Sequence, residues 1–210
     1  MARILIADDH ALVRAGLRQF LDEDSLVSDI GEAESGNETL ARLRSGKWDL
    51  LLLDINMPDR SGLDILRYIR ASYPETKVIV LSGLPERLYA LNVLRAGAAG
   101  FLPKECAPEE LLKAVRAVLQ GRRYLTASMA ELLVADFDGE SEKPLHSRLS
   151  EREFQIFCKV ATGRTVSSIA EELCLSVKTV STYRSRILEK MSMSSNADIT
   201  TYALRNEMIV

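Results

Sequence analysis

Carboxylates, a hydroxyl and a lysine follow short apolar runs in the first half of the chain. The run RILIA ends at Asp8 and Asp9, LLLL ends at Asp54, VIVL ends at Ser82, and GFLP leads into Lys104. Three crowded carboxylates repel one another, and a small divalent cation such as Mg²⁺, which binds carboxylate and carbonyl oxygens plus water, relieves that repulsion. A carboxylate in such a site can act as a nucleophile and form an aspartyl phosphate. The lysine and the serine hydroxyl can then engage the attached anion.

These side chains meet only if the apolar runs are neighbouring parallel strands. Short apolar runs alternate with amphipathic stretches, which predicts a doubly wound α/β fold with five strands and five helices. Ligand sites of open parallel sheets lie at the carboxyl ends of the strands, which is where the polar groups fall. The expected strands are 3–7, 26–33, 49–54, 77–82 and 98–103, and the expected helices are 10–22, 36–45, 62–72, 86–96 and 107–120.

The overall composition is that of a globular protein whose two ends differ in charge. The 210 residues are 47% hydrophobic and 27% charged, with a net charge of −3. Residues 148–210 carry nine Lys and Arg against seven Asp and Glu, whereas residues 1–121 carry fifteen against eighteen. No apolar stretch approaches the roughly 20 residues that span a bilayer. Because the N-terminal MARILIADDH reaches an acidic residue at Asp8, we do not expect it to act as a signal peptide. We therefore expect a cytoplasmic protein with no membrane partner and with reduced cysteines.

The residue pattern changes between the two ends of the chain. Residues 122–147 contain a possible helix over 126–135, followed by the acidic, Gly- and Pro-punctuated DGESEKP. We interpret 136–147 as a flexible linker. Beyond it the pattern is entirely helical, and Ser150 with Glu153 forms a capping-box pattern. The expected helices are 150–162, 166–173, 177–191 and 195–207.

Residues 166–191 have the layout of a helix-turn-helix, whose second helix enters the major groove of DNA. In the helix 177–191, Val180, Ile187 and Leu188 follow helical spacing on one face. The other face carries hydroxyls and cations that suit base edges and phosphates: Lys178, Ser181, Thr182, Ser185 and Arg186, with Arg184 adding charge. A solvated basic helix of an α-helical bundle has the same pattern, so charge alone leaves that alternative open.

The motifs of the first half resemble those of a known family. IADDH, LLLLDINMPDRSG, VIVLSG and AAGFLPKE look like the strand ends of the receiver domain of bacterial response regulators, in the right order over about residues 2–121. The resemblance implies a flavodoxin-like fold with strand order 2-1-3-4-5. It also implies that Asp54 accepts a phosphoryl group from a sensor histidine kinase. Mg²⁺ is then bound by Asp9, Asp54 and the main-chain carbonyl of Asn56, with Asp8 acting through water.

The resemblance also assigns roles to the ends of the last two strands. Ser82 and Phe101 match the switch hydroxyl and the switch aromatic residue of the family, and Lys104 matches its phosphate-binding lysine. Phe101 lacks the hydroxyl that a tyrosine carries there, so any switch at this position works by packing. Pro103 precedes the lysine, whereas a proline often follows it in the family.

The C-terminal motifs resemble a second family. LSEREFQIF, AEELCLSVKTVSTYRSRILEKM and ALRNEMIV look like the LuxR-type DNA-binding domain over about residues 148–210, behind a receiver as in response regulators of the NarL/FixJ type. The resemblance implies base reading at three hydroxyl positions and phosphate contacts at two basic ones, which are Ser181, Thr182 and Ser185, and Lys178 and Arg186. The last helix pairs two such domains in relatives. Its expected exposed face includes Ile199, Tyr202 and Ala203, and we expect a homodimer on double-stranded promoter DNA.

We interpret the protein as a phosphorylation-switched transcription regulator with three segments. These are a receiver over 1–121, a linker over 122–147 and a DNA-binding domain over 148–210. A regulator with the same fold that binds DNA independently of phosphorylation stays open as the alternative. Such proteins usually lose part of the acidic pocket, which this chain keeps.

The residues argue against two further functions, an enzyme activity and a chemical role for the histidines. Aspartyl-phosphate phosphatases and phosphotransferases typically carry a D-x-D motif, in which the first aspartate is the nucleophile and the second is the acid/base. Here Asn56 stands two residues after Asp54 and cannot protonate a leaving group, so we expect no enzyme. His10 and His146 have no acidic or cysteine partner at catalytic spacing, and we assign them no chemistry.

Overall fold

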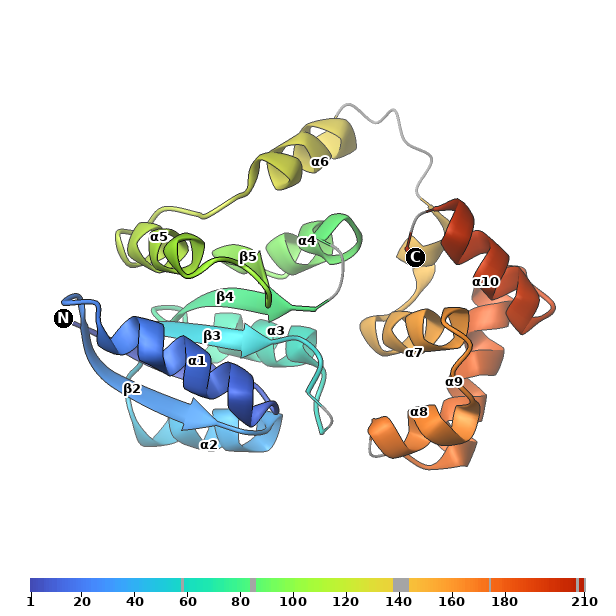
Figure 1. Cartoon of the computed structure of the whole chain (residues 1–210), viewed down its shortest axis with the longest axis horizontal. Helices are drawn as coiled ribbons and strands as arrows, with labels where there is room; N and C mark the ends of the chain where they lie inside the picture. The colour runs from blue at the N-terminus through green and yellow to red at the C-terminus, as the bar shows by residue number, and fades with distance from the viewer. Residues whose placement is uncertain (58, 84–85, 138–143, 174, 207, 210) are drawn as a thin grey trace. The chain divides into compact units, whose positions relative to one another are not determined.

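The computed structural model forms two compact units, Met1–Phe137 and Asp138–Val210 (Figure 1). Each unit has its own core, and the sites below lie within one unit or the other. The residues that the structure describes are 1–57, 59–83, 86–137, 144–173, 175–206 and 208–209.

The first unit is a five-stranded parallel sheet in the order β2-β1-β3-β4-β5 (Figure 1). The doubly wound fold and its predicted strand order are confirmed, and each expected element ends within two residues of its predicted bounds. The strands are β1 (Ala2–Ala7), β2 (Val27–Ala33), β3 (Leu50–Asp54), β4 (Lys77–Ser82) and β5 (Gly100–Pro103). The helices are α1 (Ala11–Asp22), α2 (Gly36–Ser45), α3 (Gly62–Ser72), α4 (Glu86–Arg95) and α5 (Pro108–Leu119).

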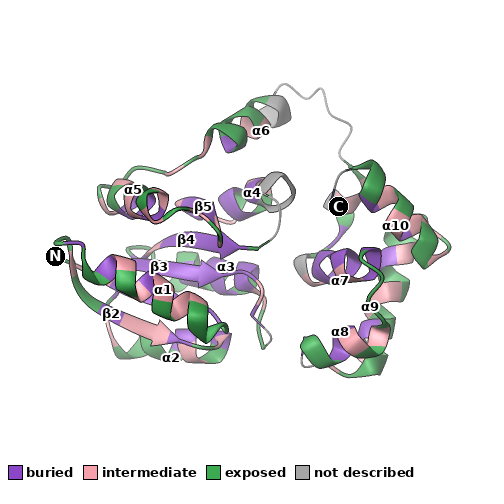
Figure 2. Cartoon of the chain, in the orientation of Figure 1, coloured by how far each residue is buried: buried purple, intermediate pink, exposed green. Residues whose placement is uncertain are grey.

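The leucine run forms the centre of this sheet because both of its faces are covered. Side chains of a strand alternate between faces, so Leu50 and Leu52 join the core formed with α1 and α5. The two leucines between and after them, Leu51 and Leu53, point to the opposite face and are also fully buried. Figure 2 shows the central strands buried along their length. A strand held this firmly delivers Asp54 at its end to a fixed position.

Part of the stretch expected as a linker packs against the first unit. Helix α6 (Ala127–Phe137) covers the predicted helix, contacts α4, and buries Met129 completely. Before it, the N–H of Tyr124 donates to the carbonyl of Ala99 (2.9 Å), next to the edge strand β5. Of the expected flexible segment 136–147, residues 136–137 belong to α6 and residues 145–147 belong to a 3₁₀ helix, whereas residues 138–143 lie outside the described residues.

The second unit is helical throughout its described residues. A 3₁₀ helix, η1 (Leu145–Arg148), precedes α7 (Glu151–Ala161), α8 (Val166–Glu172), α9 (Val177–Lys190) and α10 (Asn196–Arg205). Helix α7 packs against the other three helices. The predicted capping box is present, since the N–H of Ser150 donates to Oε2 of Glu153 (2.7 Å) and the N–H of Glu153 donates to Oγ of Ser150 (3.4 Å). Both groups satisfy backbone donors at the start of α7.

Candidate functional site

Four side chains converge at the carboxyl ends of β1 and β3. One potential ligand atom each from Asp8, Asp9, His10 and Asp54 lies within 4.8 Å of all the others. Asp8 and Asp54 are fully buried, whereas the side chain of Asp9 is 30% exposed. The expected meeting of three carboxylates is therefore observed, because β1 and β3 are paired neighbours in the sheet.

Lys104 pairs with two of these carboxylates. Its Nζ donates to Oδ2 of Asp54 (2.8 Å) and lies 2.8 Å from Oδ2 of Asp8. The second contact is an ion pair outside hydrogen-bonding geometry, and Oδ2 of Asp8 is buried without a hydrogen-bond partner. A backbone bond from the N–H of Lys104 to the carbonyl of Ser82 (2.9 Å) fixes the lysine beside the end of β4.

The charges and donors of the pocket fit a divalent cation. Two of the three carboxylates share the ammonium of Lys104, and the guanidinium of Arg14 donates to the main-chain carbonyl of Asp8 (2.7 Å), so negative charge is still in excess if all three carboxylates ionise. The buried oxygen of Asp8 that lacks a hydrogen bond is a further ligand position, and carboxylate oxygens are what hard divalent cations prefer. Asp8, Asp9 and Asp54 can hold such an ion.

The pocket shifts the proton affinities of its own groups. Burial, together with the charge of Asp8, outweighs the attraction of Lys104 and raises the pKa of Asp54 to about 6. Burial works to lower the pKa of Lys104, but the carboxylates of Asp54 and Asp8 raise it on balance. Asp54 is therefore a carboxylate that gains from a nearby positive charge.

The loop after β3 is held against the pocket by close backbone packing. The N–H of Asn56 donates to Oδ1 of Asp54 (2.9 Å), so its peptide lies at the acidic cluster. At Gly62, where α3 begins, a Cβ would lie 2.5 Å from Cα of Ile55. Only glycine permits this approach without displacing the loop. Asp59 serves structure instead, because its carboxylate accepts from two N–H groups at the start of α2 (2.8 Å each).

Ser82 is the last residue of β4, and Phe101 lies within the adjacent strand β5. Both are fully buried. Phe101 is the register partner of Val80, while Ser82 is the partner of Pro103. The aromatic ring is therefore packed inside the unit, with the hydroxyl residue on the neighbouring strand.

His10 belongs to the pocket, and the expectation that it has no acidic partner is wrong. Its Nδ1 lies 3.0 Å from Oδ1 of Asp8 and 2.8 Å from Oδ1 of Asp9. The signal in the sequence is its position directly after the two aspartates, where a tight turn folds the ring back over them. His146 lies in the second unit, with Nδ1 3.0 Å from the hydroxyl of Tyr202, and burial lowers its pKa.

Helix α9 presents the expected polar face to solvent. Val180 and Ile187 are fully buried against the rest of the second unit. The residues exposed on the opposite side are Lys178, Ser181, Thr182, Ser185 and Arg186. A hollow of about 340 Å³ lies between these side chains and the start of the helix, lined by Ser176, Lys178, Thr179, Thr182, Tyr183 and Arg186.

Arg184 differs from the other cations of α9. It is half-buried, and its Nε donates to Oδ1 of Asn196 at the start of α10 (2.6 Å). Two of the hydroxyls, those of Thr182 and Ser185, donate to carbonyls one turn earlier in the helix (2.9 and 3.1 Å). Their oxygens keep acceptor capacity, and the hydroxyl hydrogens can be redirected.

The expected exposed face of α10 is wrong for two of its three residues. Ile199 and Ala203 are fully buried because they face α7 inside the same unit. Tyr202 is half-buried, with its ring 6.1 Å from that of Phe157. Leu204, 54% exposed, lies on the outer face instead. The face predicted to be exposed is therefore the face that packs inside the unit.

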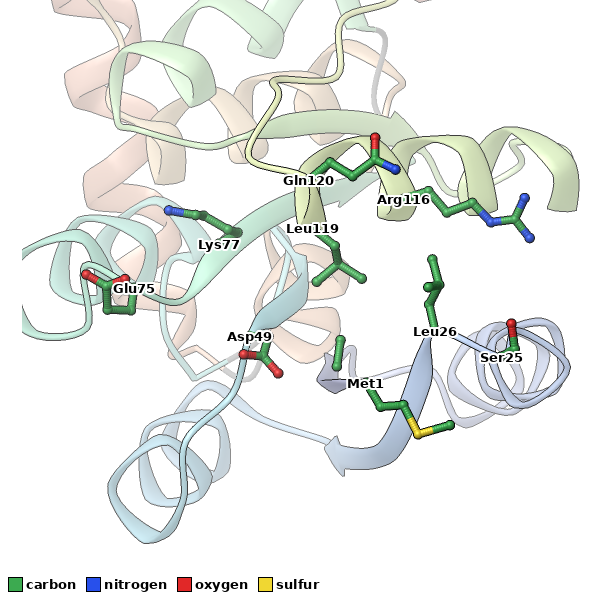
Figure 3. Close-up of a pocket in the computed structure, with 10 residues that line it drawn as sticks. Met1, Ser25, Leu26, Asp49, Glu75, Lys77, Arg116, Leu119 and Gln120 are labelled. Carbon is green, nitrogen blue, oxygen red and sulfur yellow. The ribbon is translucent and has the colours of Figure 1, made fainter.

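A second pocket lies at the opposite end of the sheet. It has a volume of about 420 Å³, and its lining includes Met1, Leu26, Lys77, Arg116 and Leu119 (Figure 3). Figure 3 shows its charged groups spread around the rim rather than directed at one point. We assign no function to it. Among the helices that the structure describes, none combines the length and apolar composition of a membrane span.

Comparison with known proteins finds family matches for both units. Residues 4–116 match the family model of the response regulator receiver domain, and residues 147–203 match that of the luxR family of bacterial regulatory proteins. The chain is 40% identical over 210 residues to the response regulator GacA of Pseudomonas protegens, covering 100% of this chain and 98% of the relative. It is 36% identical over 207 residues to the response regulator UvrY of Escherichia coli K12, covering 98% and 95%.

Solved structures give the same result. RcsB of Salmonella enterica serovar Typhimurium, bound to promoter rprA in the presence of the phosphomimetic BeF₃⁻, matches with a TM-score of 0.66 and 28% identity over 96% of this chain and 97% of that one. The chain therefore belongs to the response regulators of the NarL/FixJ type, which join an N-terminal receiver domain to a C-terminal DNA-binding domain of the luxR family.

Proposed function

We propose that Asp54 accepts a phosphoryl group from the phosphohistidine of a sensor kinase. The observation that carries this proposal is a buried carboxylate, at the end of a buried strand, paired with Lys104 and facing two further aspartates. In the transfer, an oxygen of Asp54 forms a bond to phosphorus as the bond to the kinase imidazole breaks, and the imidazole leaves with the electron pair.

The other groups of the pocket position the charges of this transfer. Lys104 moves from the carboxylate to the incoming phosphoryl oxygens, and Ser82 donates its hydroxyl to them. Asp9, Asp54 and the main-chain carbonyl of Asn56 would hold Mg²⁺, and Asp8 would act on it through water. When bound, Mg²⁺ supplies positive charge beside the phosphoryl oxygens.

The same proposal treats the chain as a phosphoacceptor rather than an enzyme that turns over a substrate. Asn56 offers no acid to a leaving group, since an amide does not titrate in this range. Phe101, buried in the present structure, repacks when the hydroxyl of Ser82 follows the phosphate. This changes the surface near α4, which α6 contacts.

The output of the switch is DNA binding by the second unit. We propose that α9 enters the major groove, with Ser181, Thr182 and Ser185 at base edges and Lys178 and Arg186 at phosphates. Arg184 supports this face through Asn196 rather than through DNA. Solved structures of RcsB bound to promoter DNA, and of two RcsB dimers bound to two parallel DNAs, support the binding of promoter DNA by a homodimer of this chain. We place this function in the cytoplasm.

We further propose that the dimer contact uses the outer face of α10, which includes Leu204, because Ile199 and Ala203 are buried. The functional segments are a receiver over 1–121, a linker over 122–147 that docks through α6, and a DNA-binding domain over 148–210.

The decisive experiment is intact-mass measurement after incubation with Mg²⁺ and acetyl phosphate. We expect a single phosphoryl adduct in wild type and in Asp64→Asn, whose carboxylate is exposed on α3, and none in Asp54→Asn. An adduct of equal size in Asp54→Asn would place the acceptor elsewhere. No adduct in any protein, even with cognate kinase, would favour a regulator that binds DNA independently of phosphorylation.

A further inference from the structure

The imidazole of His10 is built into the acidic pocket by its backbone. His10 precedes α1 with extended backbone angles, and its N–H donates to Oδ1 of Asp8 (2.8 Å). The ring Nδ1 of His10 lies 3.0 Å from this same oxygen of Asp8 and 2.8 Å from Oδ1 of Asp9. The turn that carries the two aspartates therefore also aims a ring nitrogen at them.

The nitrogen occupies a position suited to a ligand of the same cation. Ligands held at about 2.0–2.2 Å from an ion lie roughly 3–4 Å from one another. The ligand atoms of Asp8, Asp9, His10 and Asp54 lie within 4.8 Å of one another, so small side-chain rotations bring all four to one ion. The buried Oδ2 of Asp8 has no hydrogen-bond partner and is paired with the ammonium of Lys104 (2.8 Å), which Asp54 also contacts, so one ammonium serves two buried carboxylates and the pocket can take a second cation.

An imidazole changes which cation the pocket prefers. Mg²⁺ favours oxygen ligands and keeps several of its waters, so it gains little from a ring nitrogen. Zn²⁺ is a borderline ion that binds histidine nitrogen together with carboxylate oxygen and accepts four ligands. Three carboxylates and one imidazole form such a set.

We propose that His10 is a ligand of Zn²⁺ at this pocket, and that Zn²⁺ bound through His10 excludes Mg²⁺ from it. The inference deepens the proposed function, since the competing ion occupies the cation site of the phosphoacceptor. Zinc then acts as an inhibitor of phosphoryl acceptance at Asp54. The ring is 61% exposed, so it can reorient to direct a lone pair at the ion as Lys104 withdraws.

The chain offers a direct and selective readout of this coordination. It contains two histidines, His10 and His146, so a proton–nitrogen correlation spectrum of the imidazoles shows two rings. His146 is the matched control because it lies in the other unit, beside Tyr202. Reading the rings rather than total bound metal keeps zinc bound by cysteine thiols from being mistaken for this site.

The test titrates Zn²⁺ into the unphosphorylated full-length protein and follows both rings. We expect a coordination shift at one nitrogen of His10, no shift at His146, and reversal by excess Mg²⁺. A His10 ring that Zn²⁺ leaves unmoved, or that moves away without a coordination shift, would overturn the proposal. No phosphoryl donor is present, so failure here is distinct from failure of phosphoryl acceptance.

Calorimetry then compares His10→Ala with His146→Gln. Loss of an outer-shell partner of a metal ligand already costs about 10- to 100-fold in affinity, so we expect His10→Ala to weaken the tightest Zn²⁺ site by roughly tenfold or more. We expect Mg²⁺ affinity to change by less than about threefold, since water replaces the nitrogen. Equal Zn²⁺ affinity in the two variants would contradict the proposal.

Discussion

The carboxyl group of Asp54 is held in a place where its charge is unfavourable. Its pKa of about 6, against an ordinary value of 3.8, reflects burial first and the charge of Asp8 next, with Lys104 compensating in part. A folded state that binds this proton more tightly than the unfolded state is stabilised at low pH. That stabilisation is fully present below pH 3.8 and is lost as pH rises through about 6.

We therefore predict that Asp54→Asn stabilises the first unit at pH 7.5 without divalent cations, by up to about 3 kcal/mol. The gain over wild type should shrink as pH falls towards 4, because asparagine does not titrate and wild type recovers its proton. Denaturant unfolding is followed by fluorescence of Trp48, the single tryptophan, which lies buried in the first unit.

Addition of Mg²⁺ provides the control for this measurement. A cation that binds the folded state alone stabilises it by mass action, so Mg²⁺ should stabilise wild type more than Asp54→Asn. If the two proteins had the same stability from pH 4 to pH 7.5, the raised pKa would be wrong.

Sequence reasoning predicted the pocket where strand topology determines it. Asp54 and Lys104 were found because parallel strands bring their carboxyl ends to one edge. The partners of His10 were missed because its position directly after two aspartates shows only that the groups are close in sequence, whereas the contact depends on how the backbone directs the ring. Ile199 and Ala203 were misplaced because a short helix packed on one side has few residues to define its buried face.

The start of α3 controls the loop that carries the site. A Cβ at position 62 would meet the backbone of Ile55, at 2.5 Å from Cα and 2.9 Å from the carbonyl oxygen. We predict that Gly62→Ala destabilises the first unit by about 1–3 kcal/mol, since backbone must shift to relieve the overlap. It should also weaken Mg²⁺ binding, because the shifted loop carries Asn56. Denaturant unfolding followed by Trp48 fluorescence measures the first effect, and the gain in stability on adding Mg²⁺ measures the second.

Gly16 is the matched control for this substitution. It lies inside α1, and a Cβ there would meet no atom within 4 Å. Gly16→Ala should stabilise the unit by about 0.5–1 kcal/mol, since alanine loses less backbone entropy in a helix. Equal effects of the two substitutions would show that steric contact at Ile55 does not limit the loop.

The faces of α9 lead to a prediction about salt dependence. Each phosphate contact contributes about 0.9 to the slope of log affinity against log salt concentration. We predict that Lys178→Ala and Arg186→Ala each reduce this slope by about 0.9 per subunit and weaken binding to all sequences alike. Arg184→Ala should leave the slope nearly unchanged, because that side chain is bound to Asn196. Fluorescence anisotropy of labelled DNA at several salt concentrations measures all three variants.

The elements themselves were largely predictable, because apolar period and capping residues are local signals. The helix 62–72 and the strand 77–82 have the bounds read from the sequence. The docking of α6 was not predictable, since it depends on contact with α4, about forty residues earlier. Local pattern indicated a helix there but carried no information about its partner.

For the whole molecule, phosphorylation matters only if it stabilises one of two states more than the other. A full swing from 1:99 to 99:1 requires a bias of about 10⁴-fold, or roughly 5.5 kcal/mol. Couplings between sites in one protein are typically about 1–3 kcal/mol, or 5- to 150-fold. A partial shift is therefore the physical expectation, with some DNA binding by the unmodified protein.

We predict that acetyl phosphate with Mg²⁺ raises the affinity of wild type for promoter DNA by about 5- to 150-fold. The path proposed for this coupling runs from the phosphoryl group through Ser82 and Phe101 to α4 and the docked α6. Asp54→Asn should retain the affinity of the unmodified protein and show no response, since its charge change is confined to the first unit. Anisotropy titrations of both proteins, with and without donor, measure the ratio. If modified and unmodified wild type bound equally at confirmed stoichiometric phosphorylation, the two units would be uncoupled, and DNA binding would stand as a constitutive property of the second unit.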